Sequence, residues 1–104
     1  MLFTRSATLL EACVLSALSG GDTYGYELSS RLNGVQEISE STLYPVLRRL
    51  QKENLLSTYD SAVNGRNRRY YSLTDGGREK LSEYVSAWEK YKTAIDRALY
   101  GREQ

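Results

Sequence analysis

The apolar residues of this chain recur mainly at intervals of three and four, the spacing that gathers side chains on one face of an α-helix. Four segments carry this pattern and are predicted to be helices, at about residues 4–18, 22–32, 39–52 and 74–100. Thr74 can cap the last of them, which would then run for roughly 26 residues, or ~39 Å. The pattern therefore predicts three short helices and one long helix.

The starts of the second and third helices depend on which polar residue caps them. Asp22 or Thr23 is expected to cap the second helix. Its buried face is expected to be Tyr24, Leu28 and Leu32. The third helix is capped by Ser39 or by Ser41. A start at Ser39 would place Pro45 past the first turn, where it should kink the helix, whereas a start at Ser41 tolerates the proline better.

A single β-hairpin is predicted between the third and fourth helices. Asn64-Gly65 is a strong signal for a two-residue hairpin turn. Centring the turn there aligns a charge pair, an aromatic pair and an aliphatic pair across the two strands. The expected partners are Asp60 with Arg69, Tyr59 with Tyr70, Thr58 with Tyr71, and Leu56 with Leu73. The predicted fold class is thus mainly α with a small β-hairpin (α+β).

The last helix is too long to be covered by three short helices. Its apolar residues form a near-heptad stripe, namely Leu81, Tyr84, Val85, Trp88, Tyr91, Ile95, Ala98 and Leu99. Because the distal half of this stripe has no partner within the chain, it is predicted to pack against a second subunit.

Positive charge is concentrated in residues 41–73. These carry six Arg or Lys against two acidic residues, a net +4, although the whole chain has a formal net charge of only +1. The polar and basic positions of the third helix and the hairpin tip are Ser41, Thr42, Tyr44, Pro45, Arg48, Arg49, Lys52, Arg66 and Arg68. A helix sized for the major groove beside a basic two-stranded ribbon predicts a winged helix-turn-helix that binds double-stranded DNA.

These observations give the expected organisation and exclude several classes of protein. Residues 1–74 should form the winged helix-turn-helix DNA-binding domain and residues 75–104 a C-terminal dimerisation helix, in one compact unit. The sequence has no histidine, nucleophile motif or glycine-rich phosphate loop, so no enzyme activity, metal or cofactor is expected. The chain has a single cysteine, Cys13, and it lacks both a signal peptide and a ~20-residue apolar span. These features indicate a cytoplasmic protein.

Three groups of residues, in order and within residues 7–100, resemble the PadR family of bacterial transcriptional regulators. The resemblance is to the short subfamily that has a single C-terminal helix. The groups are Tyr24–Leu28 (YGYEL), Ser41–Leu50 (STLYPVLRRL), and Gly65–Thr74 followed by Gly77. The chain departs from the family at Asn67, where many members carry proline.

The resemblance implies a homodimeric repressor of a palindromic operator, with the third helix in the major groove and the hairpin on the flanking backbone or minor groove. It implies that the first and last helices form the dimer, so the expected interface residues are Leu10, Val14, Val85, Trp88, Ile95 and Leu99. In the multidrug-responsive branch, a tryptophan on the last helix lines a pocket for planar aromatic compounds. Trp88 occupies the matching place, and the expected effector-binding residues are Trp88, Leu9 and Tyr91. Glu89 and Asp96 could favour a cationic compound there.

Simpler interpretations remain open for each group of residues. Basic side chains on a helix are usually a solvated face, and Arg69 could serve only to pair with Asp60. Winged helices also act as protein–protein interaction modules without DNA binding, although the positive segment favours DNA. An aromatic stripe more often belongs to the core than to a ligand site, so Trp88 could be a packing residue. Cys13 could likewise be a small buried hydrophobic residue.

Overall fold

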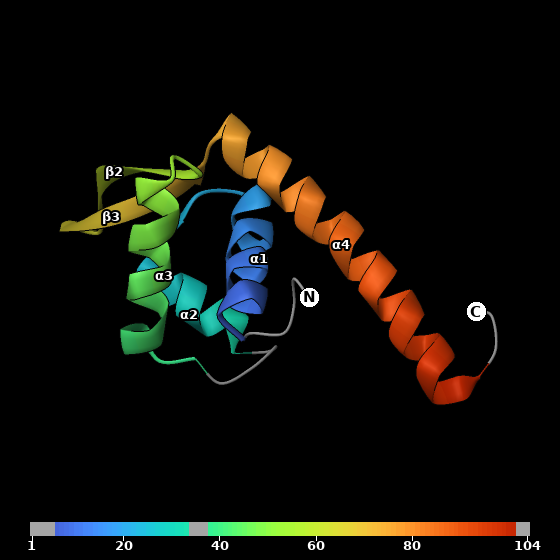
Figure 1. Cartoon of the computed structure of the whole chain (residues 1–104). Coiled ribbons are helices and arrows are strands. Elements are labelled where there is room, and N and C mark those ends of the chain that lie inside the picture. Colours follow the sequence, from blue (N-terminus) through green and yellow to red (C-terminus); the bar gives the residue numbers. More distant parts are fainter. Residues whose placement is uncertain (1–5, 34–37, 102–104) are drawn as a thin grey trace.

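The computed structural model describes residues 6–33 and 38–101. Its elements are, in chain order, α1 (Ser6–Ser19), β1 (Thr23–Tyr24), α2 (Gly25–Leu32), α3 (Glu40–Lys52), β2 (Leu56–Val63), β3 (Arg66–Leu73) and α4 (Asp75–Tyr100). The β2–β3 hairpin projects from one side of the body formed by α1–α3, and α4 extends from the other (Figure 1). The predicted fold class is confirmed, and the predicted start of the first helix at about residue 4 lies outside the described residues.

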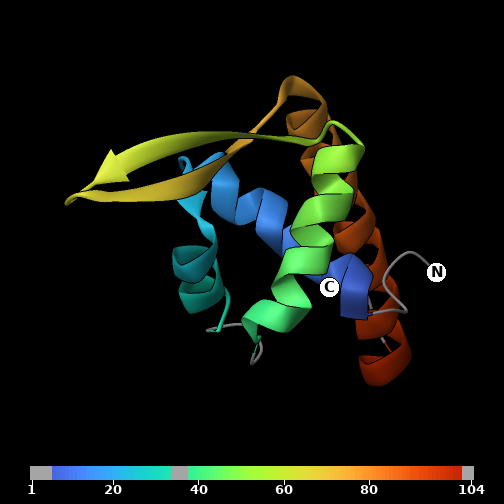
Figure 2. The same cartoon turned by 90° about the vertical axis from the view of Figure 1, so that its left-hand side faces the viewer.

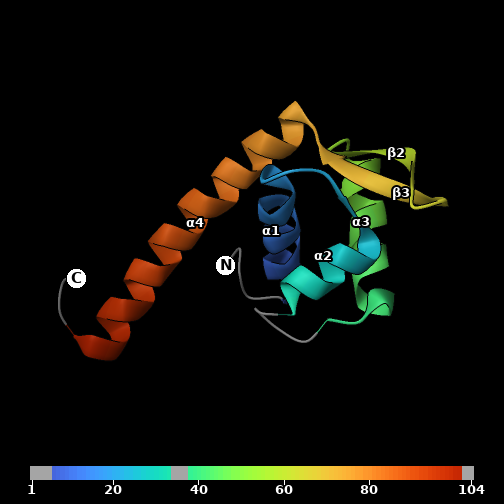
Figure 3. The ribbon, with the colours of Figure 1, turned by 180° about the vertical axis from the view of Figure 1, so that it is seen from behind.

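The hydrophobic core lies where α1, α2 and α3 meet (Figure 2, Figure 3). All three helices supply fully buried leucines, namely Leu15, Leu18, Leu28, Leu43, Leu47 and Leu50. Burial of each such side chain contributes ~1.5–3 kcal/mol. Because the leucines of α3 point inward, the opposite face of that helix is presented to the outside.

The hairpin has the register that its turn predicts. Asn64 and Gly65 have φ angles of 53° and 78°, which is the left-handed conformation that a type I′ turn requires. The observed partners confirm the four predicted pairs: Asp60 with Arg69, Tyr59 with Tyr70, Thr58 with Tyr71, and Leu56 with Leu73. The turn therefore places the basic residues of β3 along a twisted two-stranded ribbon.

A third strand, β1, changes the predicted start of the second helix. Thr23 and Tyr24 pair with Tyr71 and Tyr70, so the sheet has the order β1-β3-β2. This pairing holds both residues in an extended conformation, and α2 begins only at Gly25, with no side-chain cap. The predictions that Asp22 or Thr23 caps this helix, and that Tyr24 lies on its buried face, were therefore wrong.

Ser39, rather than Ser41, is the N-cap of α3. The Thr42 backbone N–H donates to Ser39 Oγ at 3.3 Å, and the helix begins at Glu40. Pro45 consequently lies inside the helix, past its first turn, on the exposed side. Since proline has no N–H, the Ser41 carbonyl lacks its usual donor four residues on.

The start of α4 is packed tightly against the base of the hairpin. Thr74 caps the helix as predicted, accepting from the Gly77 N–H at 3.0 Å and donating to the Asn54 carbonyl at 2.7 Å. A Cβ at Gly77 would overlap the carbonyl oxygen of Leu55, so only glycine fits there. The helix then runs for 26 residues to the left-handed cap at Gly101. None of the helices in the described ranges has the length and apolarity needed to cross a membrane.

Candidate nucleic-acid interface and apolar cavity

One face of α3 is exposed and polar because the opposite face is buried. Ser41, Pro45, Arg48 and Lys52 follow one another at intervals of four, three and four residues, and all four are exposed. These intervals place them along one side of a helix with 3.6 residues per turn. This row of residues, the outer face of α3, is the surface that could enter a groove.

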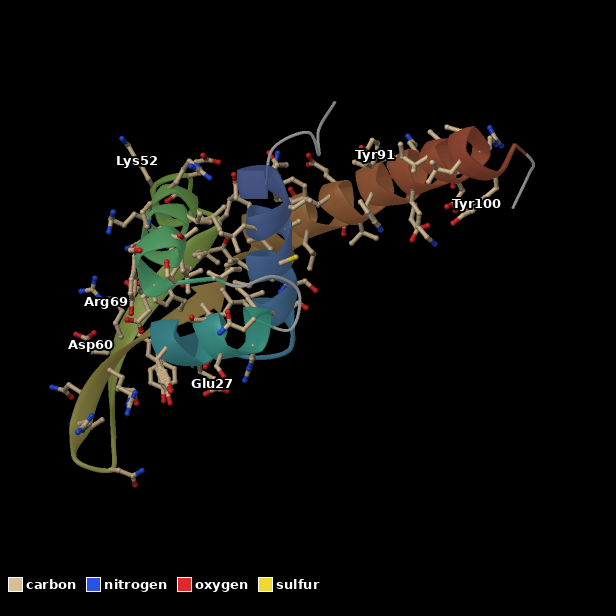
Figure 4. All side chains as sticks on the ribbon, turned by 90° about the horizontal axis from the view of Figure 1, so that it is seen from below. Glu27, Lys52, Asp60, Arg69, Tyr91 and Tyr100 are labelled. Carbon is tan, nitrogen blue, oxygen red and sulfur yellow. The ribbon has the colours of Figure 1, made fainter. Side chains whose placement is uncertain are left out.

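A concave surface lies beside this face, where α2, α3 and β3 meet. Its volume is about 410 Å³, and it is lined by Tyr24, Gly25, Tyr26, Tyr44, Arg48, Gln51, Arg68, Arg69 and Tyr71. Arg48 from the helix and Arg68 from the hairpin therefore border the same hollow. Figure 4 shows Lys52 and Arg69 at this end of the molecule, far from Tyr91 and Tyr100 on α4.

The hairpin is tied to β1 by a group of aromatic rings. Tyr70 stacks on Tyr59 at 5.5 Å between ring centroids and meets Tyr24 edge-on at 5.6 Å. The Tyr59 hydroxyl donates to Asp22 at 2.7 Å, and this hydrogen bond is the main cause that raises the pKa of Tyr59. Arg68 lies over the Tyr24 ring at 4.3 Å from its centroid, a cation–π contact. Arg68 is thus held in place at the concave surface.

Arg66 and Arg69 are less constrained than Arg68. Arg66 is exposed beside the hairpin turn. The predicted pair between Arg69 and Asp60 is present at 3.9 Å, but both side chains are more than half exposed. An exposed pair of this kind contributes at most about 1 kcal/mol, so Arg69 can leave it at little cost.

Tyr44 borders the concave surface but is half-buried rather than freely exposed. Its hydroxyl oxygen lies 2.5 Å from the position where a Cβ on Gly25 would stand. Gly25 therefore makes room for the Tyr44 ring. The absence of a side chain at Gly25 thus sets the depth of this part of the surface.

The predicted nucleic-acid residues lie in several different environments. Ser41, Pro45, Arg48 and Lys52 share the outer face of α3, while Tyr44 and Arg68 border the hollow beside it. Thr42 is exposed at the first turn, where its hydroxyl lies 3.1 Å from Ser39 Oγ. Arg49 lies on another side of α3, where its Nη2 atom is 2.5 Å from Glu11 Oε2 of α1. Arg49 is therefore turned toward α1 and away from the outer face of α3.

A second cavity, of about 370 Å³, opens between α1 and α4. It is lined by Leu9, Leu10, Ala12, Cys13, Ser16, Leu32, Ile38, Leu81, Tyr84, Val85 and Trp88. Two of the three predicted effector-binding residues, Leu9 and Trp88, are in its wall. Tyr91 is not, but its ring centroid is 6.0 Å from that of Trp88. Neither Glu89 nor Asp96 lines the cavity. Cys13 does line it, and burial raises the pKa of its thiol.

The predicted dimer-interface residues fall into two groups. Val85, Trp88, Ile95 and Leu99 are exposed on α4, at 53%, 41%, 37% and 70% respectively. Leu10 and Val14 are instead buried in the protomer's own core, at 4% and 0%. Since they offer no surface to a partner, they are removed from the expected interface. Tyr100, which is 64% exposed beside Leu99, is an apolar residue that the sequence pattern missed.

Comparison with known proteins gives a family and a set of solved structures. The Transcriptional regulator PadR-like family matches residues 14–83. The structure of smu.1704 from Streptococcus mutans has a TM-score of 0.90 and 41% identity, covering 100% of this chain and 98% of that one. The PadR-like transcriptional regulator BC4206 from Bacillus cereus has a TM-score of 0.83 and 40% identity, and the match covers 90% of this chain and 94% of that one. Bacillus subtilis PadR in complex with operator DNA has a TM-score of 0.68 and 23% identity, and the match covers 74% of this chain and 46% of that one. At this identity the similarity is one of fold.

Proposed function

Since this chain belongs to the PadR-like family of transcriptional regulators, we propose that it acts as one by binding operator DNA as a homodimer. Membership in a family of regulators confirms the expectation that it is not an enzyme. The observation that carries the proposal is the convergence of Arg48 and Arg68, from α3 and from β3, on one concave surface beside the outer face of α3. Two basic side chains from separate elements are then presented to one DNA duplex together.

We assign the parts of the surface by their geometry. The outer face of α3 enters the major groove, which is wide enough for a helix, and Arg48 reads a base edge. Arg66 and Arg68 contact phosphates of the flanking backbone from the hairpin, and Lys52 does so from α3. The helices α1–α3 with the hairpin are the DNA-binding part, and α4 is the dimerisation helix. The fold shared with Bacillus subtilis PadR, which was solved with operator DNA, supports this arrangement.

Binding should weaken steeply with salt because phosphate neutralisation dominates it. With about three to five phosphates contacted by each subunit, log K should fall with log salt at a slope of roughly −5 to −9. Arg66→Ala should flatten the slope by about one unit for each subunit while leaving sequence preference unchanged. Fluorescence anisotropy on a labelled duplex at four or more salt concentrations measures both quantities.

Lys90→Ala is the matched control, because it removes the same charge from the exposed surface of α4. Its slope should equal that of the wild type. An affinity that does not change with salt, or no binding even at low salt, would refute the proposal. That result would favour the alternative, a winged-helix module for protein–protein contact.

We further propose that the cavity between α1 and α4 binds a planar, largely apolar effector. Among the described residues its wall contains Trp88 and no charged side chain, so a neutral compound should bind better than a cation. Titration with the neutral dye Nile red should quench Trp88, the only tryptophan, more strongly than titration with cationic ethidium. Trp88→Ala should weaken dye binding about 2- to 10-fold, the value of one lost aromatic pair, and leave DNA affinity without dye nearly unchanged.

Tyr100→Ala is the control for this experiment, since it removes an exposed aromatic ring of α4 that does not line the cavity. It should bind the dye as the wild type does. If the emission of Trp88 is blue-shifted and does not respond to either dye, Trp88 is a packing residue in the assembled protein. The regulator would then respond to another signal.

A further inference from the structure

One carboxylate, that of Glu11 on α1, lies between α3 and α4. Its Oε2 accepts a hydrogen bond from Arg49 Nη2 at 2.5 Å, and its Oε1 accepts one from the Tyr84 hydroxyl at 3.3 Å. The Glu11 side chain is only 15% exposed, whereas that of Arg49 is 44% exposed. Both oxygens of a mostly buried carboxylate are therefore engaged by side chains from two other helices.

The Tyr84 hydroxyl is a stable donor to this carboxylate. Burial, and next the negative charge of Glu11, raise the pKa of Tyr84 to about 12. The hydroxyl is therefore protonated, and able to donate to Glu11, over the whole range from neutral to strongly alkaline pH. Tyr84 holds one oxygen of Glu11 from α4, and the other oxygen remains turned toward Arg49.

Arg49 is the basic residue of α3 whose charge is already matched within the protomer. It follows Arg48 in the sequence, but one residue turns a helix by 100°, so the two side chains leave α3 in different directions. In the described part of the chain, neither Arg48 nor Lys52 has a salt bridge within 4.0 Å. Removing Arg49 from Glu11 would leave a mostly buried carboxylate without its cation, which is costly.

We propose that Glu11 is a positioning residue for DNA binding, which holds Arg49 away from the phosphates and so limits affinity for arbitrary sequences. The inference rests on the proposed DNA binding. The Arg49 side chain is 44% exposed, and we expect it to turn toward a backbone beside α3 once Glu11 no longer holds it. A released arginine would add one phosphate contact in each subunit, on any sequence.

Binding of the full chain to a random-sequence duplex, over a range of salt concentrations, tests this proposal. Glu11→Gln keeps an acceptor oxygen for Tyr84 but loses the charge that holds Arg49. Its slope of log K against log salt should become steeper by about 0.9 for each subunit, and its affinity at low salt should rise about 3- to 10-fold. The double variant Glu11→Gln/Arg49→Gln should return both values to those of the wild type.

Glu89→Gln is the charge-matched control, because Glu89 is exposed on α4 and far along the chain from α3. It makes the same change in net charge and should leave the slope unchanged. Thermal unfolding of every variant checks the fold, and a purely structural role for Glu11 would lower stability without moving the slope.

Two results would overturn the proposal. One is a Glu11→Gln slope equal to that of the wild type. The other is a double-variant slope shallower than the wild type by about one unit for each subunit, which would show that Arg49 already contacts phosphate. If Glu11→Gln fails to fold, the single variant Arg49→Gln decides the matter, because it keeps Glu11: a slope equal to that of the wild type supports the proposal, and a slope shallower by about one unit for each subunit overturns it. A wild-type protein that binds no duplex refutes the proposed function itself, whereas normal wild-type binding with an unchanged Glu11→Gln slope refutes only this inference.

Discussion

Replacing Ile95 with aspartate should convert the proposed dimer to a monomer and lower operator affinity by about two orders of magnitude or more. Ile95 lies in the exposed apolar stripe of α4 with Trp88 and Leu99. An aspartate there would bury a charge in the seam between two helices, where no cation compensates for its lost hydration. The loss of affinity follows because linking two half-site contacts in one molecule raises affinity by about 10²–10⁴-fold. Sedimentation velocity and anisotropy measure the two effects.

Lys90→Asp provides the control, because it introduces the same residue at an exposed position close by on α4 but outside the stripe. It should remain dimeric and bind the operator nearly as the wild type does. A stable Ile95→Asp dimer would place the interface elsewhere. So would a stable dimer of a chain truncated after Glu83, because that chain lacks the exposed part of the stripe.

Arg48→Ala should reduce operator affinity by about 1–3 kcal/mol in each half-site and relax the preference for one base pair there. The reason is geometric: Arg48 lies on the outer face of α3 and also borders the concave surface that Arg68 shares. A bidentate contact between arginine and guanine depends on this placement, and alanine offers no replacement. Selection of bound sequences from a random library, for the wild type and the variant, measures the change at each position.

Lys52→Ala is the comparison for Arg48→Ala, since both side chains are exposed on the same face of α3. Lys52→Ala should weaken binding to all sequences alike, as expected for a phosphate contact. If Arg48→Ala does the same and leaves every position of the selected site unchanged, Arg48 is a phosphate contact and a different side chain reads the bases.

The elements that the sequence predicted well are those specified by neighbours along the chain. Thr74 caps α4 through a backbone N–H three residues away, and Asn64-Gly65 sets the hairpin register through its own left-handed backbone. The long helix ends within a residue of its predicted position because an apolar stripe continues that far and Gly101 follows it. Local signals of this kind require no knowledge of tertiary structure.

The features that were missed depend on contacts between distant residues. Thr23 and Tyr24 look like the start of a helix until β3, more than 40 residues later, pairs with them. Glu11 and Arg49 are 38 residues apart, so no spacing rule predicts that one arginine of α3 would be turned toward α1. Leu10 and Val14 follow a helical stripe that shows they are buried, but the stripe does not say whether the core or a second subunit covers them.

Gly77 packs closely against Leu55 at the start of α4. This contact determines the angle between the long helix and the rest of the protomer. For a rod of ~39 Å, a tilt of about 10° at Gly77 moves the far end by roughly 7 Å. That displacement corresponds to about two base-pair steps along B-DNA, in which one turn of about 10 base pairs rises ~34 Å. If the subunits join through the far ends of their two α4 helices, the packing at Gly77 determines the distance between the two half-sites that the dimer can span. Family members with a different residue or a different fit at this joint should therefore prefer operators with different half-site spacing, even where their α3 residues read the same bases.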